Sequence, residues 1–183
     1  MKDSQREVLD FWFIESAPAQ WFQKNEIFDD MIRERFMPVY DMAKAGLCDT
    51  WTKDSDGCLA LCIILDQFPR NMFRNDAKAF ATDDKAREIA GHAIKKGFDQ
   101  VLVPLKRRFL YLPFEHSEDP DHQQLNVELF ASMRDEDPLG YEYALRHQRI
   151  ISEFGRFPHR NKALGRPNTL AEEAYLTSLN AGF

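Results

Sequence analysis

Three short stretches of this sequence place charged or amide side chains directly beside a proline. They are residues 65–71, 111–116 and 157–161, and each contains or follows apolar residues with helical spacing. Because proline pushes the preceding residue out of helical geometry, each stretch predicts a corner where a packed helix ends. An apolar residue anchors each corner, so the polar side chains beyond it are held at fixed angles. We therefore expect a polar site where helices meet.

The first corner carries Asp66, Gln67, Arg70 and Asn71 at the end of an apolar run. Asp66 and Arg70 are four residues apart, which lets them pair if the last turn is helical. A buried Arg70 needs such a partner, because an unpaired charge in a core is very costly. Two interpretations remain open: a buried ion pair that fixes the corner, or an arginine and amides that face a ligand.

The last corner is the sharpest local signal. Gly155 permits a left-handed turn, after which Arg156, His159, Arg160 and Asn161 can converge. Residues 146–166 hold six Lys or Arg residues against one acid, although the whole chain has a net charge of −6. Arginine forks bind carboxylate or phosphate in a bidentate manner, so this stretch predicts an anion site. The alternative is cations at a helix C-terminus and arginines paired with distant acids.

Three residues are candidates for proton transfer if the protein is an enzyme. Glu115 and His116 are adjacent and could serve as general base and acid, or they form a turn at a helix end. His147 falls on the apolar face of a helix predicted over residues 140–154, so it points inward. Its alternative role is that of a core histidine bonded to a backbone carbonyl or a buried acid.

The sequence predicts no metal site and no cofactor. No His-x-x-x-His or Glu-x-x-His pair lies on one helix with both groups inward, and neither a glycine-rich phosphate loop nor a nucleophile elbow is present. The three cysteines, Cys48, Cys58 and Cys62, imply no disulfide framework. They are expected to be buried, reduced thiols, which suits a cytoplasmic protein.

The elements that must position these residues are helices. Apolar spacing and caps predict them over residues 4–13, 25–45, 57–67, 83–96, 105–112, 120–133, 138–154 and from 170 onward. Pro38 is expected to kink or divide the second of these. Because no strand pattern with hairpin chemistry appears, we predict an all-α fold of eight or nine helices in an irregular bundle or superhelix. At 183 residues it should form one domain over 1–183, and two small domains are the alternative.

Charge and hydropathy limit the partners. A net charge of −6 argues against bulk electrostatic binding to nucleic acid. The start of the chain lacks the apolar segment of a signal peptide, and the longest apolar run is too short to span a bilayer. We expect a cytoplasmic protein that binds neither nucleic acid nor membrane. The sequence gives no oligomeric state.

These residues resemble a bacterial family called domain of unknown function 924, over essentially the whole chain. The resemblance is carried by residues 8–13, 21–22, 65–74, 109–118 and 147–161, by Leu164-Gly165-Arg166 and by Gly182-Phe183. It implies an all-α fold similar to tetratricopeptide-repeat proteins, and no established activity, substrate or cofactor. The sequence departs from the family pattern at Asn75-Asp76, where members usually carry Gly-Thr, which affects the loop after Arg74.

Three hypotheses of function follow. The leading one is a protein that binds a small carboxylated or phosphorylated metabolite in an Arg- and His-lined pocket between helices. The second is a helical-repeat scaffold that binds a protein or peptide along a groove. The third is a metal-dependent hydrolase, with His and Glu as ligands.

Overall fold

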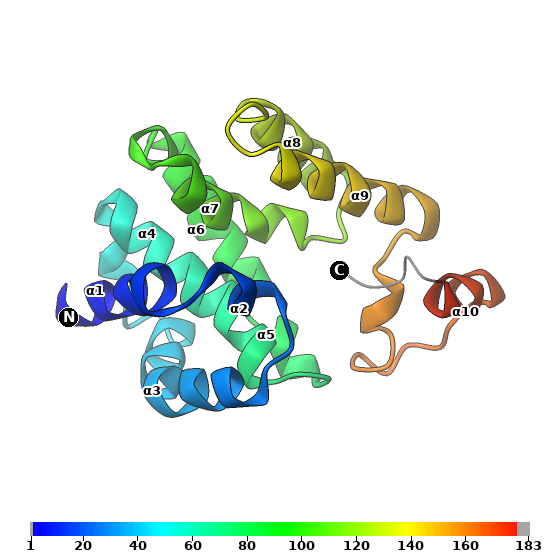
Figure 1. The fold of residues 1–183 in the computed structure, drawn as a ribbon, viewed down its shortest axis with the longest axis horizontal. Coiled ribbons are helices and arrows are strands. Elements are labelled where there is room, and N and C mark those ends of the chain that lie inside the picture. Colours follow the sequence, from blue (N-terminus) through cyan, green and yellow to red (C-terminus); the bar gives the residue numbers. More distant parts are fainter. Residues whose placement is uncertain (1, 179–183) are drawn as a thin grey trace. The chain divides into compact units, whose positions relative to one another are not determined.

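The chain is helical throughout the part that the computed structural model describes, residues 2–178 (Figure 1). No strand occurs in that range, and eight of its α-helices span eight residues or more. The predicted all-α class is therefore confirmed. Gly182-Phe183 lies outside the described residues.

The described residues divide into two compact units. Unit 1 comprises residues 2–74 and 78–113, and unit 2 comprises residues 75–77 and 114–178. The boundary falls inside one helix, α7 (Pro104–Glu115). The single domain expected over 1–183 stays a prediction, and each unit is described by itself.

Unit 1 is built from the following segments. They are α1 (Lys2–Asp10), the π-helical η1 (Phe11–Glu15), α2 (Pro18–Phe22), α3 (Glu26–Lys44), η2 (Asp49–Lys53), α4 (Ser55–Cys62), the π-helical η3 (Ile63–Gln67), α5 (Phe68–Met72), most of η4 (Ala77–Phe80), α6 (Asp83–Lys95), η5 (Asp99–Val101) and most of α7. α3 runs through Pro38 without a break, so this proline does not divide the predicted helix.

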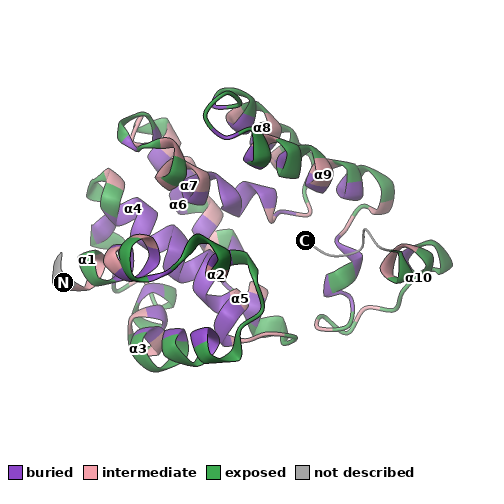
Figure 2. Cartoon of the chain, in the orientation of Figure 1, coloured by how far each residue is buried: buried purple, intermediate pink, exposed green. Residues whose placement is uncertain are grey.

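The core of unit 1 centres on α4 and η3. Every residue from Gly57 to Pro69 is buried, and Figure 2 shows α4 and α5 mostly purple while α3 has a green outer side. An aromatic cluster surrounds this core, with ring centroids of Phe36 and Phe68 4.8 Å apart and those of Trp12 and Phe68 5.6 Å apart. A helix that is apolar all round belongs in the middle of a domain, which is where the 57–67 helix was predicted to lie.

Pro69 does not end this helix, so that part of the prediction is wrong. Helical backbone continues from residue 55 to residue 72. In η3 the backbone is π-helical, so the Phe68 amide donates to the carbonyl five residues back, that of Ile63, rather than four. Proline has no N–H for the carbonyl four residues back, here that of Leu65. The Thr82 hydroxyl donates to that carbonyl instead.

The other two prolines behave differently from each other. Pro113 lies inside α7, which continues to Glu115, so the predicted helix end at this proline is also wrong. At the third corner the prediction is confirmed. α9 (Pro138–Phe154) ends at Gly155, whose φ of 68° is left-handed, and Phe157-Pro158 follows outside the helix.

Unit 2 contains the end of α7, α8 (Pro120–Ala131), α9, η6 (Pro158–Arg160) and α10 (Leu170–Thr177). α8 and α9 pack against each other, and α10 packs against η6. The capping box of α10 joins Thr169 and Glu172. In this unit Asn75 has a φ of 62°. Asparagine tolerates this left-handed conformation better than most residues, so the turn forms here without a glycine.

Candidate functional site

The predicted site residues are divided between the two units. Asp66 and Gln67 lie in η3, and Arg70 and Asn71 lie in α5, all within unit 1. The remaining residues belong to unit 2; they are Glu115, His116, His147, Arg156, His159, Arg160 and Asn161. That all of them share one site stays a prediction, and each group is described within its own unit.

In unit 1, Arg70 is held by two carboxylates. Its two terminal nitrogens donate to the two oxygens of Asp83 at 3.0 Å each, and Nη1 lies 3.2 Å from Oδ1 of Asp66. Burial lowers the pKa of Arg70, but Asp66 and Asp83 outweigh it and leave the pKa above its ordinary value. The arginine thus joins η3 and α5 to the start of α6, which matches the ion-pair interpretation of this corner.

The amides of this corner are bonded in the same way. Gln67 donates to Asp66 at 2.6 Å, and Asn71 donates to Oδ1 of the buried Asp29 at 2.7 Å. Arg74 donates to both oxygens of Asp29. These side chains tie α5 to α3 and to η3. A ligand-binding role for this group stays a prediction.

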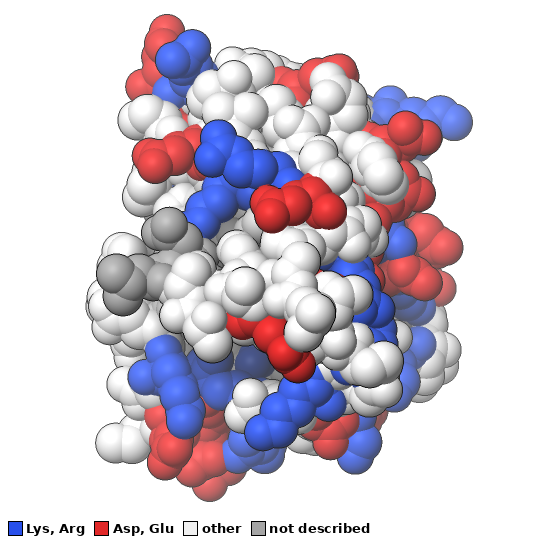
Figure 3. All heavy atoms as spheres, turned by 90° about the vertical axis from the view of Figure 1, so that its right-hand side faces the viewer, with Lys and Arg blue, Asp and Glu red and all other residues white. Residues whose placement is uncertain are grey.

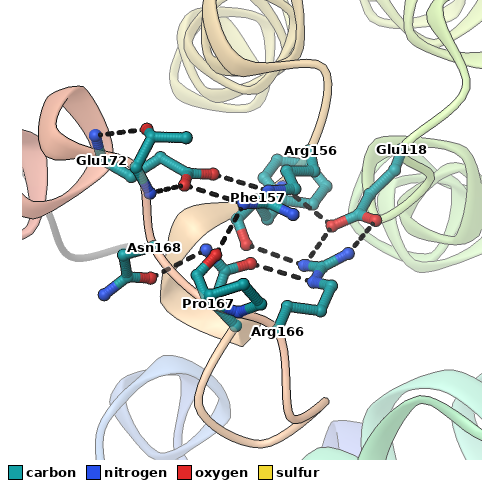
Figure 4. A network of polar contacts seen from close by, with 9 residues as sticks. Glu118, Arg156, Phe157, Arg166, Pro167, Asn168 and Glu172 are labelled. Atoms are coloured by element: carbon teal, nitrogen blue, oxygen red, sulfur yellow. Dashed lines mark hydrogen bonds and ion pairs between the residues drawn. The ribbon is translucent and has the colours of Figure 1, made fainter.

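In unit 2, Arg156 belongs to a second network, drawn in Figure 4. Its Nε and Nη2 donate to the two oxygens of the buried Glu172 at 2.6 and 2.8 Å, and Nη2 also donates to the Pro167 carbonyl. Arg156 lowers the pKa of Glu172 well below its usual range, with help from the Thr169 amide. This pair fastens α10 to the chain that follows α9.

A second arginine completes that network. Arg166 donates to both oxygens of Glu118, at 2.7 and 3.0 Å, while the Phe157 amide donates to Oε1 of Glu118 at 2.8 Å (Figure 4). Arg166 also donates to Oδ1 of Asn161, whose amide group donates to Asn168. Burial raises the pKa of Glu118, but Arg166 and the Phe157 amide outweigh it and the pKa is lowered. Sequence reasoning had not identified Arg166 or Glu118 as partners.

Three other predicted residues of unit 2 lie around one buried ring, that of Phe157, and two more lie next to His147. The guanidinium carbon of Arg160 lies 4.5 Å above this ring, and the imidazoles of His147 and His159 each have centroids 5.6 Å from it. The His116 ring is 6.3 Å from that of His147. We call His116, His147, His159, Arg160 and the adjacent Glu115 the histidine cluster. It runs from the buried His147 to the exposed His159.

His147 is neutral in this environment. Its Nδ1 lies 2.9 Å from the Tyr143 carbonyl and 3.6 Å from Oε1 of Glu115. A carbonyl only accepts, so Nδ1 carries the proton. Burial lowers the pKa of His147 well below its ordinary value, and positive charge on His116 and Arg160 adds to this effect. Both parts of the sequence interpretation therefore hold: the histidine points inward and bonds a backbone carbonyl.

Two buried amides beside Glu115 were missed by sequence reasoning. Gln123 and Asn126 on α8 are fully buried, and their side-chain oxygens have no hydrogen-bond donor among residues 2–178. Leaving such an oxygen unsatisfied costs about 1–3 kcal/mol. The buried face of α8 is formed by Gln123, Asn126 and Phe130. Their spacing of three and four residues is helical, but a search for apolar residues does not detect it because two of the three are amides.

No three His, Cys, Asp or Glu side chains in the described part of the chain are placed to hold a metal ion together. The hydrolase hypothesis thus has no ligand set there. Cys48, Cys58 and Cys62 are buried free thiols, as predicted, and burial raises the pKa of Cys58 to about 11.

Acidic and basic side chains are intermixed on the face that Figure 3 shows. Among the described helices, none combines the length and apolar character needed to cross a bilayer.

The fold and these buried polar networks define an all-helical protein with an aromatic-rich core. A sequence profile matches residues 8–180; its family is described as bacterial protein of unknown function (DUF924). The chain therefore belongs to this family, as the sequence resemblance indicated. A solved structure of a protein of unknown function from Agrobacterium tumefaciens is 39% identical, with a TM-score of 0.91, over 96% of this chain and 98% of that one. A search of curated proteins found no match.

Proposed function

We propose that the histidine cluster of unit 2 binds a small anion, carboxylated or phosphorylated. The observation that carries this proposal is the gathering of Arg160, His147 and His159 around the ring of Phe157, with His116 next to His147. Each of these side chains can donate a hydrogen bond, and all become cationic when protonated. Like charges repel at such distances, and a bound anion offsets that repulsion.

The roles of the arginines differ in this proposal from those expected from sequence. Arg156 and Arg166 hold Glu172 and Glu118 in two-pronged pairs, so they brace the site. Arg160 is the guanidinium nearest the imidazoles, where it helps to lower the pKa of His147. We assign anion recognition to Arg160, His116 and His159. His147 forms the buried side of the site.

The test uses inorganic phosphate and succinate, with sodium chloride at matched ionic strength as the reference. Both anions should raise the midpoint of thermal unfolding, because a ligand that binds only the folded state stabilises it. Arg160→Gln should abolish that increase. Arg149→Gln is the matched control, since Arg149 is exposed on α9, and it should retain the increase.

A second readout separates specific binding from general salt effects. A bound anion adjacent to His147 should raise the pKa of this imidazole, which can be followed by proton NMR during a pH titration. Equal stabilisation of both arginine variants, or a His147 titration unchanged by either anion, would overturn the proposal.

A further inference from the structure

The side-chain oxygens of Gln123 and Asn126 point to a second half of the ligand. Both residues lie on α8, three positions apart and therefore on one face of the helix. Both are fully buried, and neither oxygen has a donor in residues 2–178. They are thus hydrogen-bond acceptors inside unit 2.

The orientation of each amide is fixed by its neighbours. The Gln123 nitrogen donates to the carbonyls of Glu115 and Ser117 at 2.7 and 2.6 Å. The Asn126 nitrogen lies 3.4 Å from Oε2 of Glu115. Carbonyls and ionised carboxylates can only accept hydrogen bonds. The NH2 groups must therefore face these atoms, and the amide oxygens must face away from them.

These acceptors lie beside the histidine cluster. The oxygen and nitrogen of one amide group are about 2.3 Å apart, so the Asn126 oxygen is within about 6 Å of Oε2 of Glu115. The other oxygen of Glu115 is 3.6 Å from Nδ1 of His147. One edge of the cluster thus contains hydrogen-bond acceptors and a carboxylate, whereas Arg160 places a guanidinium over the Phe157 ring.

We propose that the ligand is a small amino acid, with its acid group on the Arg160 side and its ammonium group on Asn126 and Gln123. This inference rests on the proposed function. An ammonium group has three N–H donors and a positive charge. It has enough donors for both amide oxygens, and the carboxylate of Glu115 lies next to Asn126. A hydroxyl group has one donor and serves only one of the two oxygens.

The experiment compares amino acids with the same acids lacking the amine. Isothermal titration calorimetry of the intact chain with L-glutamate and glutarate, and with L-alanine and propionate, gives two ratios of affinity. Each amino acid should bind about tenfold more tightly than its partner, as expected for hydrogen bonds that involve a charged group.

The outcomes separate this inference from the proposed function. If glutarate, propionate and phosphate bind as tightly as the amino acids, the ammonium site is wrong and the anion site stands. That result is expected if a buried water serves the two oxygens instead. If no acid binds, both proposals fail.

A variant sharpens the test. In Asn126→Leu, the ratio of L-glutamate affinity to glutarate affinity should fall close to one, while the glutarate affinity itself stays the same. A ratio that remains near tenfold in this variant would overturn the inference. Gln124→Leu changes an exposed amide on the same helix and should keep the preference. Circular dichroism shows whether each variant folds. The affinity ratio of the unaltered chain tests the inference even if a variant does not fold.

Discussion

The two units bury different kinds of polar cluster. In unit 1, Arg70 meets Asp66 and Asp83, and Arg74 and Asn71 meet Asp29. Cations and acids alternate there, and the contacts join α5 to η3, to α3 and to the start of α6. Around Phe157 in unit 2, several basic groups lie against one ring.

The amides of the two units differ in the same sense. Asn71 donates to a carboxylate at 2.7 Å, whereas the oxygens of Gln123 and Asn126 have no donor in residues 2–178. A buried polar atom without a partner costs stability unless a ligand completes it. The unit 1 network therefore braces the fold, and the two amide oxygens of unit 2 mark the place to seek a ligand.

The largest effect should come from breaking the brace of unit 1. Asp83→Asn removes a buried carboxylate that Arg70 contacts twice. It should lower the free energy of unfolding by about 3 kcal/mol, the lower end of the cost of breaking a buried ion pair, because Arg70 keeps Asp66 as a partner. Urea unfolding measures this. The neighbouring Asp84 is exposed, so Asp84→Asn should cost about 0.5 kcal/mol or less. Equal costs for the two variants would contradict the assignment of a brace.

A matched pair of substitutions compares the amides directly. Asn71→Leu removes a donor from buried Asp29 and should cost about 2 kcal/mol. Asn126→Leu replaces an amide whose oxygen is unsatisfied, and should cost less than about 1 kcal/mol or stabilise the protein. Chemical unfolding of both variants gives the difference. A larger cost at Asn126 than at Asn71 would show that its polar group is satisfied in the folded protein.

The pH dependence of stability tests the burial of His147. Its pKa is lowered well below 6.5 in the folded state, so below about pH 6.5 the unfolded chain binds a proton that the folded chain excludes. Stability is therefore lost as the pH falls below the unfolded value of about 6.5. His147→Gln should remove this part of the slope in urea titrations, and phosphate should reduce it. An identical slope in the variant would place the effect elsewhere.

The smallest effect should come from the Glu118–Arg166 pair of unit 2, in which a cation is matched by an acid as in unit 1. The pair is partly exposed, with 27% and 23% of the two side chains accessible, so Glu118→Gln should cost only about 1 kcal/mol at pH 7. The pKa of Glu118 is lowered. Its contribution is thus present above about pH 4.5 and is lost as the pH falls through the folded value. Glu142→Gln, at an exposed position of α9, is the control; a constant difference between the variants down to pH 2 would contradict this account.

Several features followed from the sequence alone. The burial of residues 57–67, the left-handed Gly155, the capping box of Thr169 and Glu172, and the all-α class all depend on local spacing and backbone preference. Such preferences act within a few residues, so one sequence suffices to find them. The predicted pairing of Asp66 with Arg70 succeeded for the same reason.

Only the tertiary structure decided which partner each polar group meets. Pro69 stays inside helical backbone because η3 is π-helical and the hydroxyl of Thr82, from a distant segment, donates to the Leu65 carbonyl. Arg156 pairs with Glu172 and Arg166 with Glu118, over 16 and 48 residues. Long-range partners are chosen by packing geometry, which spacing along the chain does not encode. The sequence thus determined the helices and the basic stretch, and the fold decided that Arg160, rather than Arg156, lies among the histidines.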